Sequence, residues 1–310
     1  MEEKLKLVVL LGPTATGKSH CAIKIAQRLK GEIISGDSML VYRKMNIGTA
    51  KPTAEELASV PHHLVNICDP EDSFNVVDFQ QQAQRLIQEI TDRGHLPIIA
   101  GGTGLYLKAL LEGYQFSKVD ENKDLRVRLE AQAASAGPEA LYAQLQELDP
   151  VAAAAIHPHN VRRVIRALEA ALGGETVARP AGEMLYDAVV LGLNMERSAL
   201  YSRIDKRVDL MLNQGLEQEV AGLLAAGVSP GCQSMQSIGY RQLVWYLQEG
   251  MAYEEAVAKL KQATRNFAKR QLTWYRKMPY IHWLELEANP NYELVVERMI
   301  KILEQRFKLL

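Results

Sequence analysis

The sequence predicts an α/β fold: a P-loop parallel sheet flanked by helices, with an inserted all-helical subdomain. Two observations support this prediction. Residues 1–116 alternate short apolar runs with helical patterns, which is typical of parallel strands joined by crossover helices. Residues 117–187 contain alanine- and leucine-rich helical patterns without a strand candidate, and an apolar run resumes at Ala188–Leu193. The chain is therefore expected to leave the sheet for a helical insertion and then to return to it.

The strands and helices of this layout can be placed in order. Buried parallel strands are short apolar runs, and amphipathic helices repeat apolar residues every three or four positions. The predicted strands are Leu5–Leu11, Glu32–Ser35, Leu96–Ala100 and Ala188–Leu193. The predicted helices are Lys18–Leu29, Val77–Thr91, about Leu105–Glu112, and the whole of Arg197–Glu249. We expect 1–116 and 188–310 to form the core, whose C-terminal part is helical and basic, and 117–187 to form the insertion.

The composition is that of a soluble globular protein. Of the 310 residues, 47% are hydrophobic and 24% are charged, which allows a core of normal size. No run approaches the roughly 18 apolar residues of a membrane span. The two glutamates in MEEKLKLVVLLG do not suit a secretory signal. Three widely spaced cysteines indicate neither a disulfide framework nor a zinc site, so we expect a cytoplasmic protein without membrane association.

Charge is distributed unevenly along the chain. The formal net charge is −1, but Ala256–Met278 contains seven basic residues and no acidic residue, which leaves −8 for the rest. Such a segment either binds a polyanion or forms a solvated helix face, and charge alone does not decide between these. The aromatic pair within it, Trp274 and Tyr275, could stack on bases or could bury one ring. The basic residues are Lys259, Lys261, Arg265, Lys269, Arg270, Arg276 and Lys277.

The most specific motif is a phosphate-binding loop. Residues 12–19, GPTATGKS, match G-x-x-x-x-G-K-[ST] after a predicted strand and at the start of a predicted helix, which is the context the motif requires. Its glycines let backbone N–H groups converge on phosphate oxygens at the positive end of the helix. Lys18 adds a positive charge, and the Ser19 hydroxyl can bind Mg²⁺. The motif predicts a bound di- or triphosphate. Its members are Gly12, Pro13, Thr14, Ala15, Thr16, Gly17, Lys18 and Ser19.

The acidic residue that P-loop NTPases use to hold Mg²⁺ is missing from the expected strand end. The strand at 96–100 is followed by GGTG (101–104), whereas Asp37 follows the strand at 32–35. Because parallel strands end at the same edge of a sheet, Asp37 and Thr103 are both expected to face the P-loop. Structural roles stay open for both residues, Asp37 as a helix cap and Thr103 as a partner of local backbone groups.

Six segments together carry a family resemblance. They are GPTATGKS, GDSMLVYRKMNIGTAKP (36–52), PHHLVNICDP (61–70), IIAGGTGLYLKALLEG (98–113), HPHNVRRVIRALE (157–169) and KRQLTWYRK (269–277). In combination they resemble the tRNA dimethylallyltransferases, also called tRNA isopentenyltransferases, from Leu5 to about Trp283. The resemblance implies transfer of a dimethylallyl group from dimethylallyl diphosphate to the N6 amine of the adenosine 3′-adjacent to the anticodon in tRNA, with release of diphosphate.

The resemblance also implies catalytic roles. Asp37 would accept a proton from the weakly nucleophilic adenine amine as a general base. Thr103 would donate a hydrogen bond to the diphosphate, while Lys18, Mg²⁺ on Ser19, and Arg207 would stabilise the charge that develops on it. Arg203 is the alternative to Arg207, since arginines four positions apart share a helix face.

The implied partner is the anticodon stem-loop of tRNA, bound by a protein that we expect to be a monomer. The target base must leave its stack to react, and residues 37–40 would meet it. Arginines at 162–166 suit the phosphates of a folded loop. The residues assigned to tRNA are Asp37, Ser38, Met39, Leu40, Thr103, Arg126, Arg162, Arg163, Val164, Ile165 and Arg166.

Three other functions stay open. A small-molecule P-loop kinase also combines this motif with a helical lid. A prenyltransferase acting on free adenine nucleotides would not need the two basic segments. A nucleotide-gated RNA-binding module would leave Asp37 and Thr103 without a role.

Overall fold

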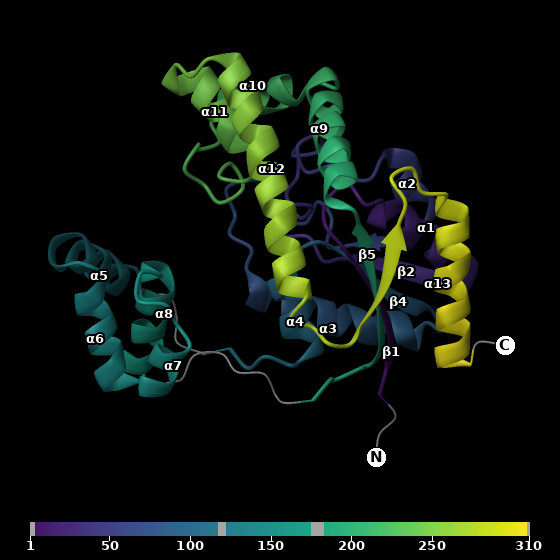
Figure 1. Ribbon diagram of the computed structural model, residues 1–310, viewed down its shortest axis with the longest axis horizontal. Coiled ribbons are helices and arrows are strands. Elements are labelled where there is room, and N and C mark those ends of the chain that lie inside the picture. Colours follow the sequence, from purple (N-terminus) through teal and green to yellow (C-terminus); the bar gives the residue numbers. More distant parts are fainter. Residues whose placement is uncertain (1–3, 117–121, 175–182, 309–310) are drawn as a thin grey trace. The chain divides into compact units, whose positions relative to one another are not determined.

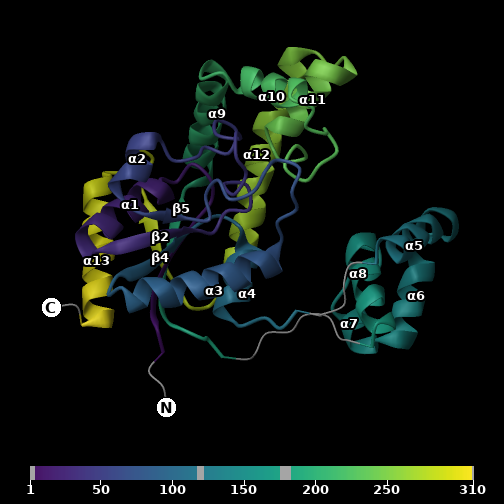
Figure 2. The ribbon, with the colours of Figure 1, turned by 180° about the vertical axis from the view of Figure 1, so that it is seen from behind.

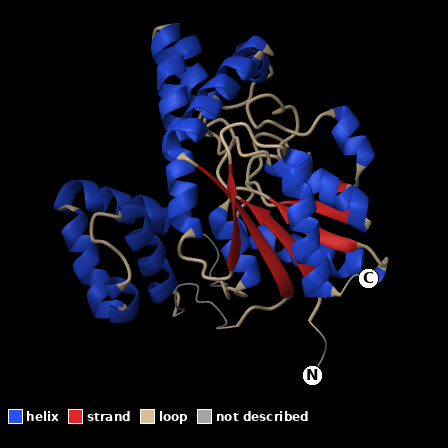
Figure 3. Ribbon diagram, turned by 45° about the vertical axis from the view of Figure 1, so that its right-hand side comes forward, coloured by secondary structure: helices blue, strands red, loops and turns tan. Residues whose placement is uncertain are grey.

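The computed structural model describes residues 4–116, 122–174 and 183–308. These residues contain a six-stranded sheet with the strand order β3-β2-β4-β1-β5-β6 and parallel pairing throughout. Helices cover both of its faces, as the sequence predicts (Figure 3). The strands are β1 (Lys6–Leu11), β2 (Gly31–Ser35), β3 (His62–His63), β4 (Leu96–Ala100), β5 (Asp187–Met195) and β6 (Ile281–Leu286).

The chain divides into two compact units, Met1–Leu111 with Met184–Leu310, and Glu112–Glu183. The first contains the sheet and the helices labelled around it in Figure 1. These are α1 (Lys18–Leu29), α2 (Ala54–Ser59), α3 (Val76–Asp92), α4 (Gly104–Leu111), α9 (Arg197–Asn213), α10 (Leu216–Ala225), α11 (Tyr240–Glu249), α12 (Tyr253–Tyr275) and α13 (Tyr292–Phe307). The second contains α5 (Lys123–Ala136), α6 (Pro138–Leu148), α7 (Pro150–Ala154) and α8 (Val161–Leu172), and its described residues include no strand.

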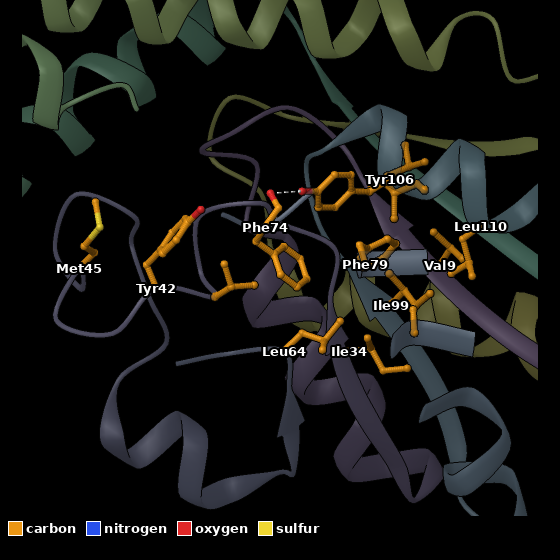
Figure 4. Packing of buried hydrophobic residues seen from close by; sticks show 14 of the residues in the cluster. Val9, Ile34, Tyr42, Met45, Leu64, Phe74, Phe79, Ile99, Tyr106 and Leu110 are labelled. Atoms are coloured by element: carbon orange, nitrogen blue, oxygen red, sulfur yellow. Dashed lines mark hydrogen bonds between the residues drawn. The ribbon is translucent and has the colours of Figure 1, made fainter. Parts of the chain in front are cut away.

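The core of the first unit lies on both faces of the sheet. Side chains alternate along β1: Leu7, Val9 and Leu11 join the cluster of α3 and α4, while Val8 and Leu10 join that of α1 and α13. Figure 4 shows the first cluster, in which the rings of Phe79 and Tyr106 stack with centroids 4.7 Å apart. Figure 2 shows α3 and α4 from the other side of the molecule. A strand buried on both faces is expected to be apolar, as β1 is from Leu7 to Leu11.

Several parts of the core unit differ from the sequence prediction. Residues 214–215 and 226–239 form turns that separate α9, α10 and α11, so the prediction of helix through Arg197–Glu249 is wrong at both places. The physical reason is local: Gly227 and Gly239 have φ of 86° and 101°, and Pro230 lies between them. Helix α2 and strand β3 were not predicted, and neither were strand β6 and helix α13, which complete the sheet and one of its faces.

Of the described helices, none combines the length and the apolar character that crossing a membrane requires.

Candidate active site

The P-loop, Asp37 and Thr103 lie together at the carboxyl ends of neighbouring strands of the sheet. They follow β1, β2 and β4, which are neighbours in the order β2-β4-β1. Backbone hydrogen bonds join the three loops: Gly101 N–H donates to Leu10 O at 3.2 Å and Thr103 N–H to Gly36 O at 3.2 Å. The structure therefore brings together the residues that strand direction placed at this edge.

The P-loop leaves the start of α1 open to an anion. Gly17 precedes the helix with φ 85°, and no side chain caps it. The N–H groups of the first helical turn lack intrahelical partners, so they are available to a phosphate group. Gly17 is required here, because a Cβ atom at this position would lie 2.4 Å from the ring of Tyr292. Lys18 Nζ donates to Pro13 O at 2.9 Å and so lies over the loop.

Arg203 and Tyr292 hold the P-loop from its carbonyl side. Arg203 Nε donates to Ala15 O at 3.0 Å, and its Nη2 donates to the Tyr292 hydroxyl at 2.7 Å. That hydroxyl donates to Thr16 O at 3.1 Å. In a trans peptide the carbonyl and the following N–H point in opposite directions, so the Thr16 and Gly17 amides point away from this pair. Arg203 thus supports the loop, which leaves Arg207 as the candidate contact for the diphosphate.

Asp37, Lys18 and Arg207 form one electrostatic group. Burial raises the pKa of Asp37 above its ordinary range, against the lowering effects of the Met39 amide and of the charges on Lys18 and Arg207. Burial and the charge of Arg207 lower the pKa of Lys18 to about 8, while Asp37 opposes the change. Burial also lowers the pKa of Arg207, again opposed by Asp37. A carboxylate with a raised pKa beside two cations can accept a proton next to a bound anion.

The segment after Asp37 is tied to Thr103. The Asp37 Oδ1 atom accepts a hydrogen bond from Met39 N–H at 2.8 Å. Ser38 N–H donates to Thr103 Oγ1 at 3.1 Å, so the local backbone role proposed for Thr103 is present. The Thr103 hydroxyl itself donates to Ser38 Oγ at 3.4 Å, a long hydrogen bond that a diphosphate oxygen would have to replace. Met39 and Leu40 are half-buried.

Two residues of α12 complete this edge, and the sequence analysis did not assign them. Gln271 Oε1 accepts from Thr14 N–H at 3.0 Å, and its Nε2 donates to Gly102 O at 2.9 Å. The Tyr275 hydroxyl also donates to Gly102 O at 2.9 Å. The available signal was their i, i+4 spacing inside KRQLTWYRK. Of the aromatic pair, Tyr275 is fully buried and Trp274 is 41% exposed.

Hard oxygen ligands suit Mg²⁺, which proteins typically hold with one or two side chains and the phosphates of the substrate. Ser19 is exposed at the first turn of α1, and the described residues give its hydroxyl no hydrogen-bond partner. Within the same described residues, no group of three or more His, Cys, Asp or Glu side chains has the arrangement of a metal site. The P-loop therefore fits a metal that binds together with a diphosphate.

The arginines of the helical unit differ in their surroundings. Arg162 and Arg163 are exposed on α8, and within the described chain neither forms an ion pair. Arg166 and Arg126 both contact the buried carboxylate of Glu169, at 2.5 and 2.8 Å. The side chains of Val164 and Ile165 lie in the core of this unit and are 0% and 4% exposed.

The basic segment is partly neutralised. Its first half forms three ion pairs: Lys259–Glu255 at 3.4 Å, Lys261–Asp209 at 2.6 Å and Arg265–Asp205 at 2.6 Å. The four basic residues of its second half are exposed, and the described part of the chain offers no ion pair to Lys269, Arg270, Arg276 or Lys277. Within this basic segment, a polyanion would therefore meet uncompensated charge near the C-terminal end of α12.

Comparisons with known proteins identify the family of the chain. Residues 40–278 match the IPP transferase family. A tRNA dimethylallyltransferase of Bacillus cytotoxicus is 49% identical over 92% of each chain, and one of Symbiobacterium thermophilum is 45% identical over 98% of this chain and 97% of its own.

Solved structures give the same relationship. A full-length tRNA isopentenylpyrophosphate transferase from Bacillus halodurans is 46% identical over 99% of both chains, with a TM-score of 0.74. A eukaryotic dimethylallyltransferase acting on tRNA is 27% identical over 97% of this chain and 80% of its own, with a TM-score of 0.79. The chain belongs to the IPP transferase family, the family of the tRNA dimethylallyltransferases.

Proposed function

We propose that this protein transfers the dimethylallyl group of dimethylallyl diphosphate to the N6 amine of the adenosine 3′-adjacent to the anticodon in tRNA, releasing diphosphate. The observation that carries the proposal is that Asp37 follows β2 at the same end of the sheet as the P-loop, where the charges of Lys18 and Arg207 act on its carboxylate. A proton acceptor and an anion site at the same place suit a reaction in which an amine loses a proton and a diphosphate departs.

Different residues of the site would bind the diphosphate, accept the proton and orient the leaving group. The P-loop amides, Lys18 and Arg207 bind the diphosphate and stabilise the negative charge that it gains as the allylic C–O bond breaks. The amine nitrogen forms the new N–C bond and passes its proton to the Asp37 carboxylate. Thr103 donates a hydrogen bond to a diphosphate oxygen, and its contact with Ser38 keeps it beside Asp37.

Magnesium is proposed as the metal, held by the Ser19 hydroxyl together with the diphosphate. When bound, it would neutralise charge on the leaving group. The chain's own contribution is to keep Ser19 exposed next to the open first turn of α1.

The tRNA is proposed to use residues of both units. Asp37, Ser38, Met39, Leu40 and Thr103 would meet the target base. Arg162 and Arg163 would contact phosphates, as would the exposed cations at the end of α12. Arg126 and Arg166, which both contact Glu169, would fix α5 against α8 and so orient the exposed arginines of α8. Val164 and Ile165 pack in the core beneath these arginines. We expect the enzyme to act as a cytoplasmic monomer.

One labelling experiment tests the proposal. The protein is incubated with Mg²⁺ and dimethylallyl diphosphate carrying a label in its dimethylallyl group, with tRNA, AMP or ATP as acceptor. Label should appear in tRNA, and digestion should locate it on one adenosine. Label in AMP would favour the enzyme of free nucleotides. A kinase would leave all three acceptors unlabelled and would instead transfer label from γ-labelled ATP.

A further inference from the structure

The two substrate-facing loops of the site are joined by one side chain. Gln271 accepts from the P-loop at Thr14 N–H (3.0 Å) and donates to the β4–α4 loop at Gly102 O (2.9 Å). Gln271 is 4% exposed; its bond to Gly102 O is buried, and its bond from Thr14 N–H is partly buried. Because buried polar groups that lose their partners are destabilising, the two loops are held at a fixed separation by this residue.

Tyr275 supports the same connection from the next turn of α12. Its hydroxyl donates to Gly102 O at 2.9 Å, so this carbonyl accepts two hydrogen bonds from α12. With the Gly102 carbonyl turned toward α12, the following N–H of Thr103 points the other way and donates to Gly36 O at 3.2 Å. The orientation of the peptide that precedes Thr103 is therefore set from α12.

The connection lies directly beside the proposed general base. A Cβ atom at Gly102 would lie 2.4 Å from Gln271 Nε2 and 3.8 Å from Asp37 Oδ2. Gly102 thus lies close to both side chains, and a larger residue there would displace the Gln271 amide. A displaced Gln271 would no longer hold the Gly102 carbonyl, whose peptide precedes Thr103 and lies near the Asp37 carboxylate.

We propose that Gln271 and Tyr275 are positioning residues of the reaction: together they fix the P-loop relative to Asp37 and Thr103. This inference rests on the proposed function. The same end of α12 presents Lys269, Arg270, Arg276 and Lys277 to solvent, so the helix that would meet tRNA phosphates also holds the reacting groups in register.

The test compares variants that keep side-chain size and remove hydrogen bonds. Gln271→Met removes both bonds of Gln271, and Tyr275→Phe removes one donor. The matched controls are Gln80→Met and Tyr106→Phe in the same core unit. Gln80 Nε2 donates to Ala109 O at 3.0 Å and the Tyr106 hydroxyl to Phe74 O at 3.3 Å (Figure 4), and both are nearly buried. The controls lose comparable hydrogen bonds that do not touch the P-loop.

Three measurements are made on each variant: steady-state prenyl transfer, affinity for Mg²⁺-pyrophosphate by calorimetry, and affinity for tRNA. We expect Gln271→Met to lower kcat by about tenfold to a hundredfold, the scale of a small misplacement of reacting groups. Its pyrophosphate affinity should fall severalfold and its tRNA affinity should stay unchanged. Tyr275→Phe should show the same pattern more weakly, and both controls should keep the kcat and pyrophosphate affinity of the wild type.

The outcomes separate the two proposals. If Gln271→Met keeps the kcat and pyrophosphate affinity of the wild type, or if its losses match those of Gln80→Met at equal loss of thermal stability, the positioning role is overturned. If wild-type protein transfers no dimethylallyl group, the proposed function fails, and pyrophosphate affinity of the variants against their controls still decides whether α12 fixes the P-loop.

Discussion

At the scale of single residues, the site depends on a balance between burial and charge. Burial alone raises the pKa of Asp37 and lowers the pKa of Lys18, which would discharge both groups. Their mutual attraction opposes this, and the charge of Arg207 favours the ionised carboxylate while disfavouring the ammonium. The raised pKa makes the Asp37 carboxylate a stronger proton acceptor than an exposed aspartate, which is what an amine nucleophile needs.

Replacing the proposed base should slow the chemistry without weakening binding. Asp37→Asn keeps the shape and the hydrogen bond from Met39 N–H but cannot accept the proton as a carboxylate does. Single-turnover prenyl transfer should fall by roughly 10²-fold or more, the usual contribution of general-base catalysis. Asp92→Asn, an exposed change on α3, is the control and should react like the wild type. An unaltered rate in Asp37→Asn would make Asp37 a structural residue.

The lowered pKa of Lys18 gives diphosphate binding a defined pH dependence. Lys18 is protonated below its pKa of about 8 and loses its charge as the pH rises through that value. The phosphate groups are already ionised there, since their last pKa is near 6. Affinity for dimethylallyl diphosphate should therefore decrease between about pH 7 and pH 9. In Lys18→Ala, binding should be weaker and nearly independent of pH, while tRNA affinity stays close to wild type. A wild-type pH profile in this variant would contradict the assignment.

At the scale of elements, one buried carboxylate joins the neighbouring strands β3, β2 and β4. Glu32 on β2 accepts from His63 on β3 at 2.6 Å and from His95 at 2.7 Å and Arg93 at 2.8 Å, both just before β4. Burial by itself would raise the pKa of Glu32, but the hydrogen bonds from Arg93, His63 and His95 and the charge of Arg93 lower it to about 2. The ionised form of Glu32 thus stabilises the fold.

The sign of the pH effect follows from this shift. Because the pKa is lower in the folded state than the ordinary 4.5, the stabilisation is present above pH 4.5 and is lost as the pH falls toward 2. Its full size is on the order of 3 kcal/mol. Glu32→Gln should therefore lower the free energy of unfolding at pH 7, and the difference from wild type should shrink between pH 4.5 and pH 2.

Urea unfolding across this pH range measures the effect. The control is Glu89→Gln, which removes an exposed ion pair with Arg85 and should cost less than about 1 kcal/mol at every pH. A constant difference between wild type and Glu32→Gln from pH 7 to pH 3 would contradict the assigned role.

The elements differ in how far the sequence determines them. Helix Lys18–Leu29 and strand Leu96–Ala100 were predicted with the bounds that the structure has, because each has a clear apolar pattern and a glycine at its boundary. Strand β6 was missed because His282 and Glu285 interrupt the apolar pattern of an edge strand that is half exposed.

The site residues also differ in how far the sequence predicts them. Strand order and direction bring Asp37 and Thr103 to the P-loop, and a motif identifies Lys18. The contacts of Gln271 join residues 257 and 169 positions apart, and no local periodicity encodes such a pairing. Arg203 was named as a diphosphate contact, and only its bonds to Ala15 O and Tyr292 place it behind the loop.

At the scale of the whole molecule, uncompensated positive charge occurs in both units. Arg162 and Arg163 are exposed on α8, and four cations are exposed at the C-terminal end of α12. Lys259, Lys261 and Arg265 are instead paired with acidic side chains. If both exposed sets bind tRNA phosphates, binding must release counterions, and log K should fall linearly with log salt.

Single substitutions should change the slope of that line in proportion to the phosphates that each residue contacts. For single-stranded character the slope is about −0.7 per phosphate. Arg163→Ala and Lys269→Ala should each flatten the slope by roughly this amount. Lys259→Ala should change it little, because Glu255 already neutralises Lys259 at 3.4 Å. None of the three should alter affinity for dimethylallyl diphosphate, since none of these side chains takes part in the hydrogen bonds of the P-loop.

The measurement is a salt titration of tRNA affinity for the wild type and the three variants. An affinity independent of salt would remove electrostatics as the basis of recognition. An equal change in Lys259→Ala and Lys269→Ala would mean that tRNA displaces the ion pairs along α12 and uses the whole helix. If Arg163→Ala alone leaves the slope unchanged while Arg162→Ala flattens it, the phosphate contact on α8 belongs to Arg162.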